Sequence, residues 1–120
     1  MKLTELNSIK ERMDLLEKTV QPFKKRAEKY DKPAQFPFEN IEDLRAIAYP
    51  ELTIPKAFGG IGISLTEMLK HQELIGKADG STSLSIGWHM GLTKHIGENA
   101  TWKKEKYEEF VQAIKDNGAL

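Results

Sequence analysis

The chain has 120 residues, of which 39% are apolar and 30% charged, a balance that suits one soluble globular domain. Lys plus Arg and Asp plus Glu number 18 each, so the net charge of zero favours neither a nucleic acid nor an anionic membrane as partner. The lack of cysteine excludes disulfides and cysteine-based zinc sites. No apolar run approaches the ~20 residues of a membrane span, and the charged N-terminus is unlike a secretory signal. We therefore expect a cytoplasmic protein with no membrane insertion.

The first predicted element is a long amphipathic helix over residues 6–30. Its apolar residues recur at alternating steps of three and four, which places them on one stripe of a helix. Pro22 lies inside this pattern and has no backbone donor, so we expect it to kink the helix or divide it in two. The stripe consists of Leu6, Ile9, Met13, Leu16, Val20, Phe23, Ala27 and Tyr30.

A connector follows over residues 31–40, because two prolines there forbid a continued helix. Asn40 is expected to cap the next, short helix, since its side chain can accept from a free backbone N–H. Pro50 ends that helix.

Three glycines crowd the next stretch, IPKAFGGIGIS, over residues 54–64. A phosphate-binding loop needs a lysine and then a hydroxyl residue after the last glycine, but Gly62 is followed by Ile63 and Ser64. The spacing also lacks the third glycine of a dinucleotide fingerprint. We interpret the stretch as a tight turn that returns Phe58 and Ile63 to the core.

Three helices are predicted after this turn. Residues 64–67 match the capping box S-x-x-E and start the first, which Asp79 and Gly80 interrupt. A fourth helical segment covers about 81–99, and a last helix is capped by Thr101 and stopped by Asn117-Gly118. Strand-like alternation appears nowhere at convincing length. The predicted fold class is all-α, an orthogonal or up-down bundle of about five helices.

The fourth segment carries Ser83, Gly87 and Gly91 at steps of four, so they form one stripe of small residues. Glycine inside a helix costs about 1 kcal/mol relative to alanine, which suggests that something approaches this face closely. Either a neighbouring helix packs backbone to backbone, or the face is a groove wall for a thin apolar ligand. In the second case Ile86 and Met90 are expected to flank the stripe and supply the apolar lining.

A further group of apolar residues, Leu84, Trp88 and Leu92, occupies a different face of the same segment. A helix that is apolar on two sides is buried on both. A lone five-helix domain has little to place on the second side, so we expect a partner there, either another domain or another copy of the chain.

The histidines do not indicate a metal site, because none lies three or four residues from another and no acidic partner completes a ligand set. Ser85 and His89 are four residues apart and could touch on one helix face. A hydrolase would also need an orienting acid and an oxyanion hole, and the sequence marks neither. We predict no metal ligand and no catalytic residue in this chain.

Together these pieces resemble the N-terminal α-helical domain of the acyl-CoA dehydrogenase family, over nearly the whole chain. The most specific part is the signature P-x-x-F/Y-G-G-x-G-x-S from Pro55 to Ser64, placed between two helices. The family often has glycine before the turn that precedes it, where this chain has Tyr49-Pro50. The fragments that carry the resemblance are VQPFKKRAEKYDK, FPFENIEDLRAIAYPELTIPKAFGGIGIS, QELIGKADGSTSLSIGWHMG and TWKKEKYEEFVQAIKDNGAL.

The resemblance implies an enzyme with a helical N-terminal domain, a middle β-domain and a C-terminal helical bundle, which assembles as a homo-oligomer. FAD lies between the latter two domains and a neighbouring subunit. A glutamate, usually in the C-terminal domain, removes the α-proton of an acyl-CoA substrate, and flavin N5 takes the β-hydride. Residues 1–120 would then be the N-terminal domain alone, without the usual flavin contacts or the base, and inactive by themselves.

By position, the resemblance places Ile86, Gly87, Met90 and Gly91 in the wall of the acyl pocket. His89 is a further candidate for a cofactor contact, since class D flavin monooxygenases share this fold and can place polar side chains here. Two alternatives stay open beside the dehydrogenase. One is a stand-alone helical dimerisation or interaction module, and the other is the same domain of a class D flavin monooxygenase.

Overall fold

The computed structural model describes residues 1–29, 37–99 and 102–117. These residues form five α-helices and no strand, so the predicted all-α class is confirmed. Three single-turn 3₁₀ helices accompany them: η1 (Leu3–Glu5), η2 (Tyr49–Glu51) and η3 (Lys56–Phe58). The α-helices are α1 (Ile9–Lys29), α2 (Phe38–Ala46), α3 (Leu65–Ala78), α4 (Gly80–Asn99) and α5 (Lys104–Asn117).

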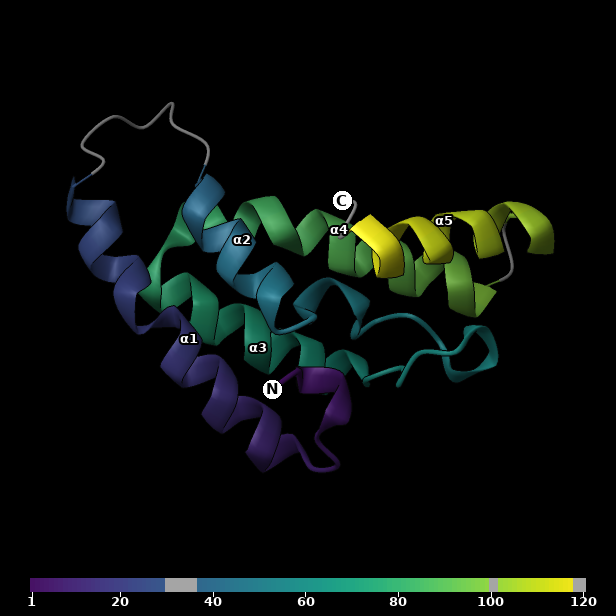
Figure 1. Cartoon of the computed structure of the whole chain (residues 1–120), viewed down its shortest axis with the longest axis horizontal. Helices are drawn as coiled ribbons and strands as arrows, with labels where there is room; N and C mark the ends of the chain where they lie inside the picture. The colour runs from purple at the N-terminus through teal and green to yellow at the C-terminus, as the bar shows by residue number, and fades with distance from the viewer. Residues whose placement is uncertain (30–36, 100–101, 118–120) are drawn as a thin grey trace.

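Helix α3 lies at the centre of the bundle, between α1 on one side and α4 on the other (Figure 1). Only Asp79 separates α3 from α4, and the two helices run antiparallel as a hairpin. Helix α1 crosses α3 at an incline, whereas α5 runs beside the second half of α4. The helical hairpin is therefore the scaffold on which the other elements are placed.

The core has two parts. The larger lies among α1, α2, α3 and the first half of α4, and the smaller joins α5 to the second half of α4 through Ile54, Ile96, Tyr107, Val111 and Ile114. The larger part is built from Leu3, Leu16, Val20, Phe23, Ile41, Leu44, Ile47, Tyr49, Leu52, Ile63, Met68, Ile75, Ile86 and Met90.

Pro22 does not divide the first helix, because α1 runs through it from Ile9 to Lys29. The missing N–H removes one hydrogen bond, and the neighbouring turns hold the helix together. The predicted stripe is buried only in its middle, at Leu16, Val20 and Phe23, while Ile9 and Ala27 are exposed. Tyr30, the last predicted member of the stripe, lies outside the described residues.

Asn40 is not a helix cap, contrary to the prediction. It lies inside α2, is buried, and its carboxamide joins three elements. Its Oδ1 accepts from Arg26 Nη1 at 3.0 Å, and its Nδ2 donates to Asp79 Oδ2 at 3.0 Å and to Thr82 Oγ1 at 2.8 Å. These partners are distant in sequence, so a local capping rule could not anticipate them.

The glycine-rich stretch is a tight turn, as predicted. Gly59 and Gly62 adopt positive φ angles of 83° and 56°, which L side chains rarely adopt. Ile63 is returned to the larger core and Phe58 packs against the smaller one. Ser64 then caps α3, its Oγ accepting from the Glu67 backbone N–H at 3.1 Å. The predicted cap Thr101 and the stop residue Gly118 lie outside the described residues.

Among the described residues, no helix has the length and apolar character that crossing a membrane requires.

Candidate functional site

A groove of about 660 Å³ runs along the outer side of the α3–α4 hairpin. None of the residues that line it is Lys, Arg, Asp or Glu, although such residues make up 30% of the chain. The groove can therefore receive an uncharged, apolar group without desolvating a charge. Its lining comprises Gln72, Gly76, Gly80, Ser83, Leu84, Gly87, Trp88, Gly91, Leu92 and His95.

The stripe of small residues faces this groove, but its two inner glycines differ. A Cβ on Gly87 would lie 2.5 Å from Nε2 of Gln72, whereas a Cβ on Gly91 would meet no atom within 4 Å. Tyr49 Oη donates to Gln72 Oε1 at 2.7 Å, and Gln72 Nε2 donates to the Ser83 carbonyl at 2.9 Å. Gly87 thus makes room for a side chain of this same chain, and Gly91 leaves open space.

Ile86 and Met90 do not line the groove, contrary to the expectation that they flank the stripe. Both are fully buried in the larger core, on the inner side of α4. Residues one position before and one position after a glycine turn about 100° to opposite sides of it, and here the side of Ile86 and Met90 faces the core. Of the four predicted pocket residues, Gly87 and Gly91 reach the groove in this structure.

The predicted second apolar side of α4 is confirmed. Leu84, Trp88 and Leu92 are 69%, 78% and 51% exposed, so the described residues of this chain leave at least half of each uncovered. They line the same groove as the glycines, which the sequence interpretation had placed on a different face. Their steps of four would have revealed a ridge beside the glycine stripe.

His89 faces inward, away from the groove. It is buried, and its Nε2 lies 3.1 Å from the carbonyl oxygen of Pro50. Burial lowers the pKa of His89, the Pro50 hydrogen bond opposes this, and the imidazole is therefore neutral at neutral pH. Ser85 donates to the Ser81 carbonyl at 2.8 Å, so the Ser85–His89 contact that the spacing allowed does not form.

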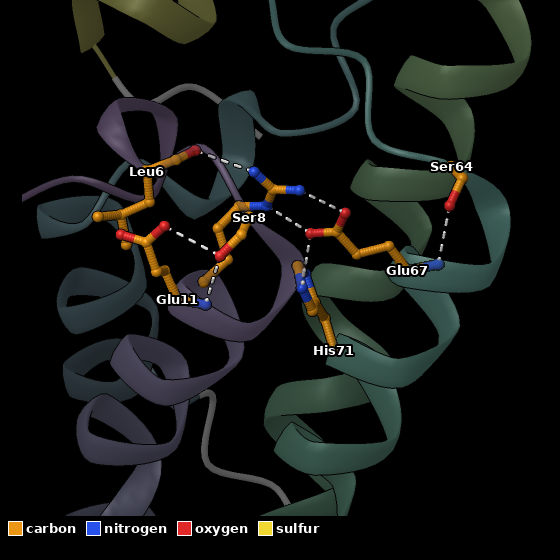
Figure 2. A network of polar contacts seen from close by, with 7 residues as sticks. Leu6, Ser8, Glu11, Ser64, Glu67 and His71 are labelled. Carbon is orange, nitrogen blue, oxygen red and sulfur yellow. Dashed lines mark hydrogen bonds and ion pairs between the residues drawn. The ribbon is translucent and has the colours of Figure 1, made fainter.

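The structure also contains a polar site that the sequence interpretation missed. It consists of Arg12, Glu67 and His71 and lies where the start of α1 meets α3. Figure 2 shows Glu67 extending from α3 toward α1, with His71 one helical turn further along. Glu67 had been interpreted only as part of a capping box, but its carboxylate bonds Arg12 instead of the Ser64 backbone. The spacing of four between Glu67 and His71 was the available signal.

Within the described residues, no three His, Asp or Glu side chains gather closely enough to hold a metal ion.

Comparison with known proteins agrees with this architecture. Residues 8–108 match the family described as acyl-CoA dehydrogenase, N-terminal domain. The chain is also 36% identical over 108 residues to YdbM of Bacillus subtilis (strain 168), a protein provisionally named an acyl-CoA dehydrogenase. That alignment covers 90% of this chain but 28% of the relative, so the chain spans less than a third of the relative's length. The chain therefore belongs to the acyl-CoA dehydrogenase family and corresponds to its N-terminal helical domain.

Proposed function

We propose that this chain is the N-terminal domain of an FAD-dependent, acyl-CoA dehydrogenase-like oxidoreductase, which introduces the α,β double bond into acyl-CoA thioesters. The observation that carries the proposal is the α3–α4 groove, which has no Lys, Arg, Asp or Glu in its lining and is left uncovered on a chain of this family. In this proposal residues 1–120 supply one wall of the acyl pocket. A middle β-domain and a C-terminal helical bundle of the same homo-oligomeric enzyme supply the rest.

In this proposal the four residues of the predicted wall have different roles. Gly91, with open space above it, is the position past which the acyl chain runs. Gly87 seats the Gln72 carboxamide and so contributes to the floor. Ile86 and Met90 lie behind the wall and hold α4 against the core, so their role is support rather than contact.

FAD, when bound in the complete enzyme, supplies the acceptor for the β-hydride. The described residues of the groove, and His89, do not fit that cofactor. The groove has no lysine or arginine to face a diphosphate, and His89 is buried with its Nε2 directed at the Pro50 carbonyl. We therefore assign no flavin contact and no catalytic role to the groove residues or to His89, and we expect the chain to be inactive alone.

The second candidate is a helical interaction module, favoured by the exposed ridge of Leu84, Trp88 and Leu92. An intact gene without dehydrogenase sequence after Leu120 would support this module and remove the enzyme proposal. The flavin monooxygenase alternative depended on His89. Since that side chain is buried, no observation in the structure favours it.

The test compares Gly91→Leu with Gln112→Leu, an exposed position on α5 outside the groove, in the enzyme that includes the downstream domains. We expect Gly91→Leu to lower kcat/KM for long-chain acyl-CoA by about tenfold or more, equivalent to ~1.4 kcal/mol, and Gln112→Leu to leave it unchanged. Equal kcat/KM in the two variants would show that Gly91 does not line the acyl pocket. Absence of acyl-CoA-dependent flavin reduction in the wild-type enzyme would refute the proposed dehydrogenase activity.

A separate measurement tests the cofactor statement. The chain alone, mixed with FAD and passed through gel filtration, should elute colourless. Stoichiometric bound flavin would contradict the conclusion that these residues do not fit the cofactor.

A further inference from the structure

One buried carboxylate ties the start of α1 to α3 (Figure 2). Arg12 donates to Glu67 twice, from Nε to Oε2 at 2.6 Å and from Nη2 to Oε1 at 2.7 Å. Its third nitrogen, Nη1, donates to the Leu6 carbonyl at 2.9 Å and so closes the turn between η1 and α1. Loss of the Arg12–Glu67 pair would therefore release both the first turn of α1 and the segment before it.

His71 is a second basic group at the same carboxylate. Its side chain is fully buried, and its Nε2 lies 3.1 Å from Glu67 Oε2. That distance is within ion-pair range, yet neither ring nitrogen makes a well-aligned hydrogen bond to any described residue. The groups that face the ring are Glu67 on its own helix, Arg12 from α1, and the Tyr49 ring from η2 at 6.0 Å. His71 therefore lies next to a carboxylate that already accepts two hydrogen bonds from Arg12.

Burial lowers the pKa of His71, the Glu67 charge opposes this, and the Arg12 charge adds to the lowering. At neutral pH the imidazole is therefore neutral and the cluster carries no net charge. Protonation in acid places two cations beside one buried carboxylate, which leaves one positive charge uncompensated.

The two cations differ in their access to water. The Arg12 side chain is 11% exposed, so its guanidinium can swing outward, whereas the fully buried His71 has no such route. Leu3 remains a separate anchor of the segment, since it is fully buried and its N–H donates to the Ile47 carbonyl at 2.8 Å. The expected response is local loosening rather than global unfolding.

We propose that Arg12, Glu67 and His71 form an acid-sensitive latch, in which protonated His71 takes Glu67 from Arg12 and residues 6–12 loosen from α3. The sign follows from linkage. The pKa of His71 is lower in the folded than in the unfolded state. Its contribution to the stability of the fold is therefore present at pH values above the unfolded pKa of about 6.5, and it is lost as the pH falls below that value. The latch is independent of the acyl-pocket proposal, since its residues lie outside the groove.

The experiment is amide hydrogen exchange on the wild-type chain at about pH 7.5 and about pH 5, corrected for the intrinsic pH dependence of exchange. Opening of residues 6–8 and the first turns of α1 should increase by about tenfold or more in acid, and opening at Leu3 and in α5 should change less. His71→Asn should abolish this acid-induced increase in opening (the step), and Arg12→Gln should show fast opening of the same segment at both pH values. His89→Gln, which removes the other buried histidine of the chain, should keep the step.

Equal protection of the N-terminal segment at both pH values in the wild type would overturn the latch, as would an unchanged step in His71→Asn. A measurement without any variant covers the case in which His71→Asn fails to fold. In an NMR titration of the wild type, the Arg12 side-chain Nε–H signal should lose its protection at the same midpoint as the His71 ring titrates. Two different midpoints would also overturn the proposal.

Discussion

Helix α4 presents the same kind of residue to two different environments. On its inner side Ile86 and Met90 are fully buried in the larger core, while on its outer side Leu84 and Trp88 are mostly exposed. Apolar character alone therefore does not identify the core of this chain. The comparison shows which side of α4 maintains the fold, and it leaves the other side free for what we propose to be the acyl pocket.

The largest effect is expected on the inner side. Met90→Ala removes a fully buried side chain and leaves a cavity, so the free energy of unfolding should fall by about 2–5 kcal/mol. Urea unfolding followed by circular dichroism measures it. A loss below about 1 kcal/mol would mean that the inner side of α4 is not packed as described.

Acid should also act through the inner side. Because burial lowers the pKa of His89, its contribution to stability is present above the unfolded value of about 6.5 and is lost as the pH falls below it. His89→Gln should therefore reduce the acid-induced fall in melting temperature. His95→Gln is the matched control on the exposed side of the same helix, and an equal reduction there would contradict the assignment.

The glycines of the groove should respond in different ways. Gly91→Ala places a methyl group in open space and should stabilise the isolated chain by about 0.5–1 kcal/mol, because alanine is the better helix former. Gly87→Ala should gain less or lose stability, since the new methyl group displaces the Gln72 carboxamide. Thermal unfolding of the two variants side by side measures the difference, and equal shifts would mean that Gln72 does not occupy the floor.

The smallest effect on stability is expected on the outer side. Trp88→Ser should change the free energy of unfolding by no more than about 0.5 kcal/mol, because the indole is already exposed. It should instead reduce self-association of the isolated chain, measured by sedimentation velocity. A destabilisation as large as that of Met90→Ala would erase the distinction between the two sides.

Local patterns predicted much of the fold. The helices follow from apolar periodicity, and the turn before α3 follows from glycines with positive φ and from the Ser64 cap. Asn40 shows where local rules fail, because its capping preference competed with partners on α1 and α4 that only the tertiary structure supplies. The Arg12–Glu67 pair, 55 residues apart in sequence, is equally invisible to any short window.

The groove was predicted in part, for a reason of helical geometry. The glycine stripe located the correct helix, but Ile86 and Met90 were placed in the lining because both neighbours of a glycine look apolar in the sequence. A helix with two apolar sides gives no contrast from which to fix its rotation. The packing of α4 against α3, α2 and η2 decides which side turns inward.

The Asn40 carboxamide has a consequence for how this fold holds together. A chain without cysteine cannot use a covalent cross-link, yet this one amide connects α1, α2 and the corner between α3 and α4. Asn40→Asp would replace the Nδ2 donor with a carboxylate oxygen facing the Asp79 carboxylate. The exchange of one nitrogen for one oxygen would thus turn a connecting hydrogen bond into a repulsive contact.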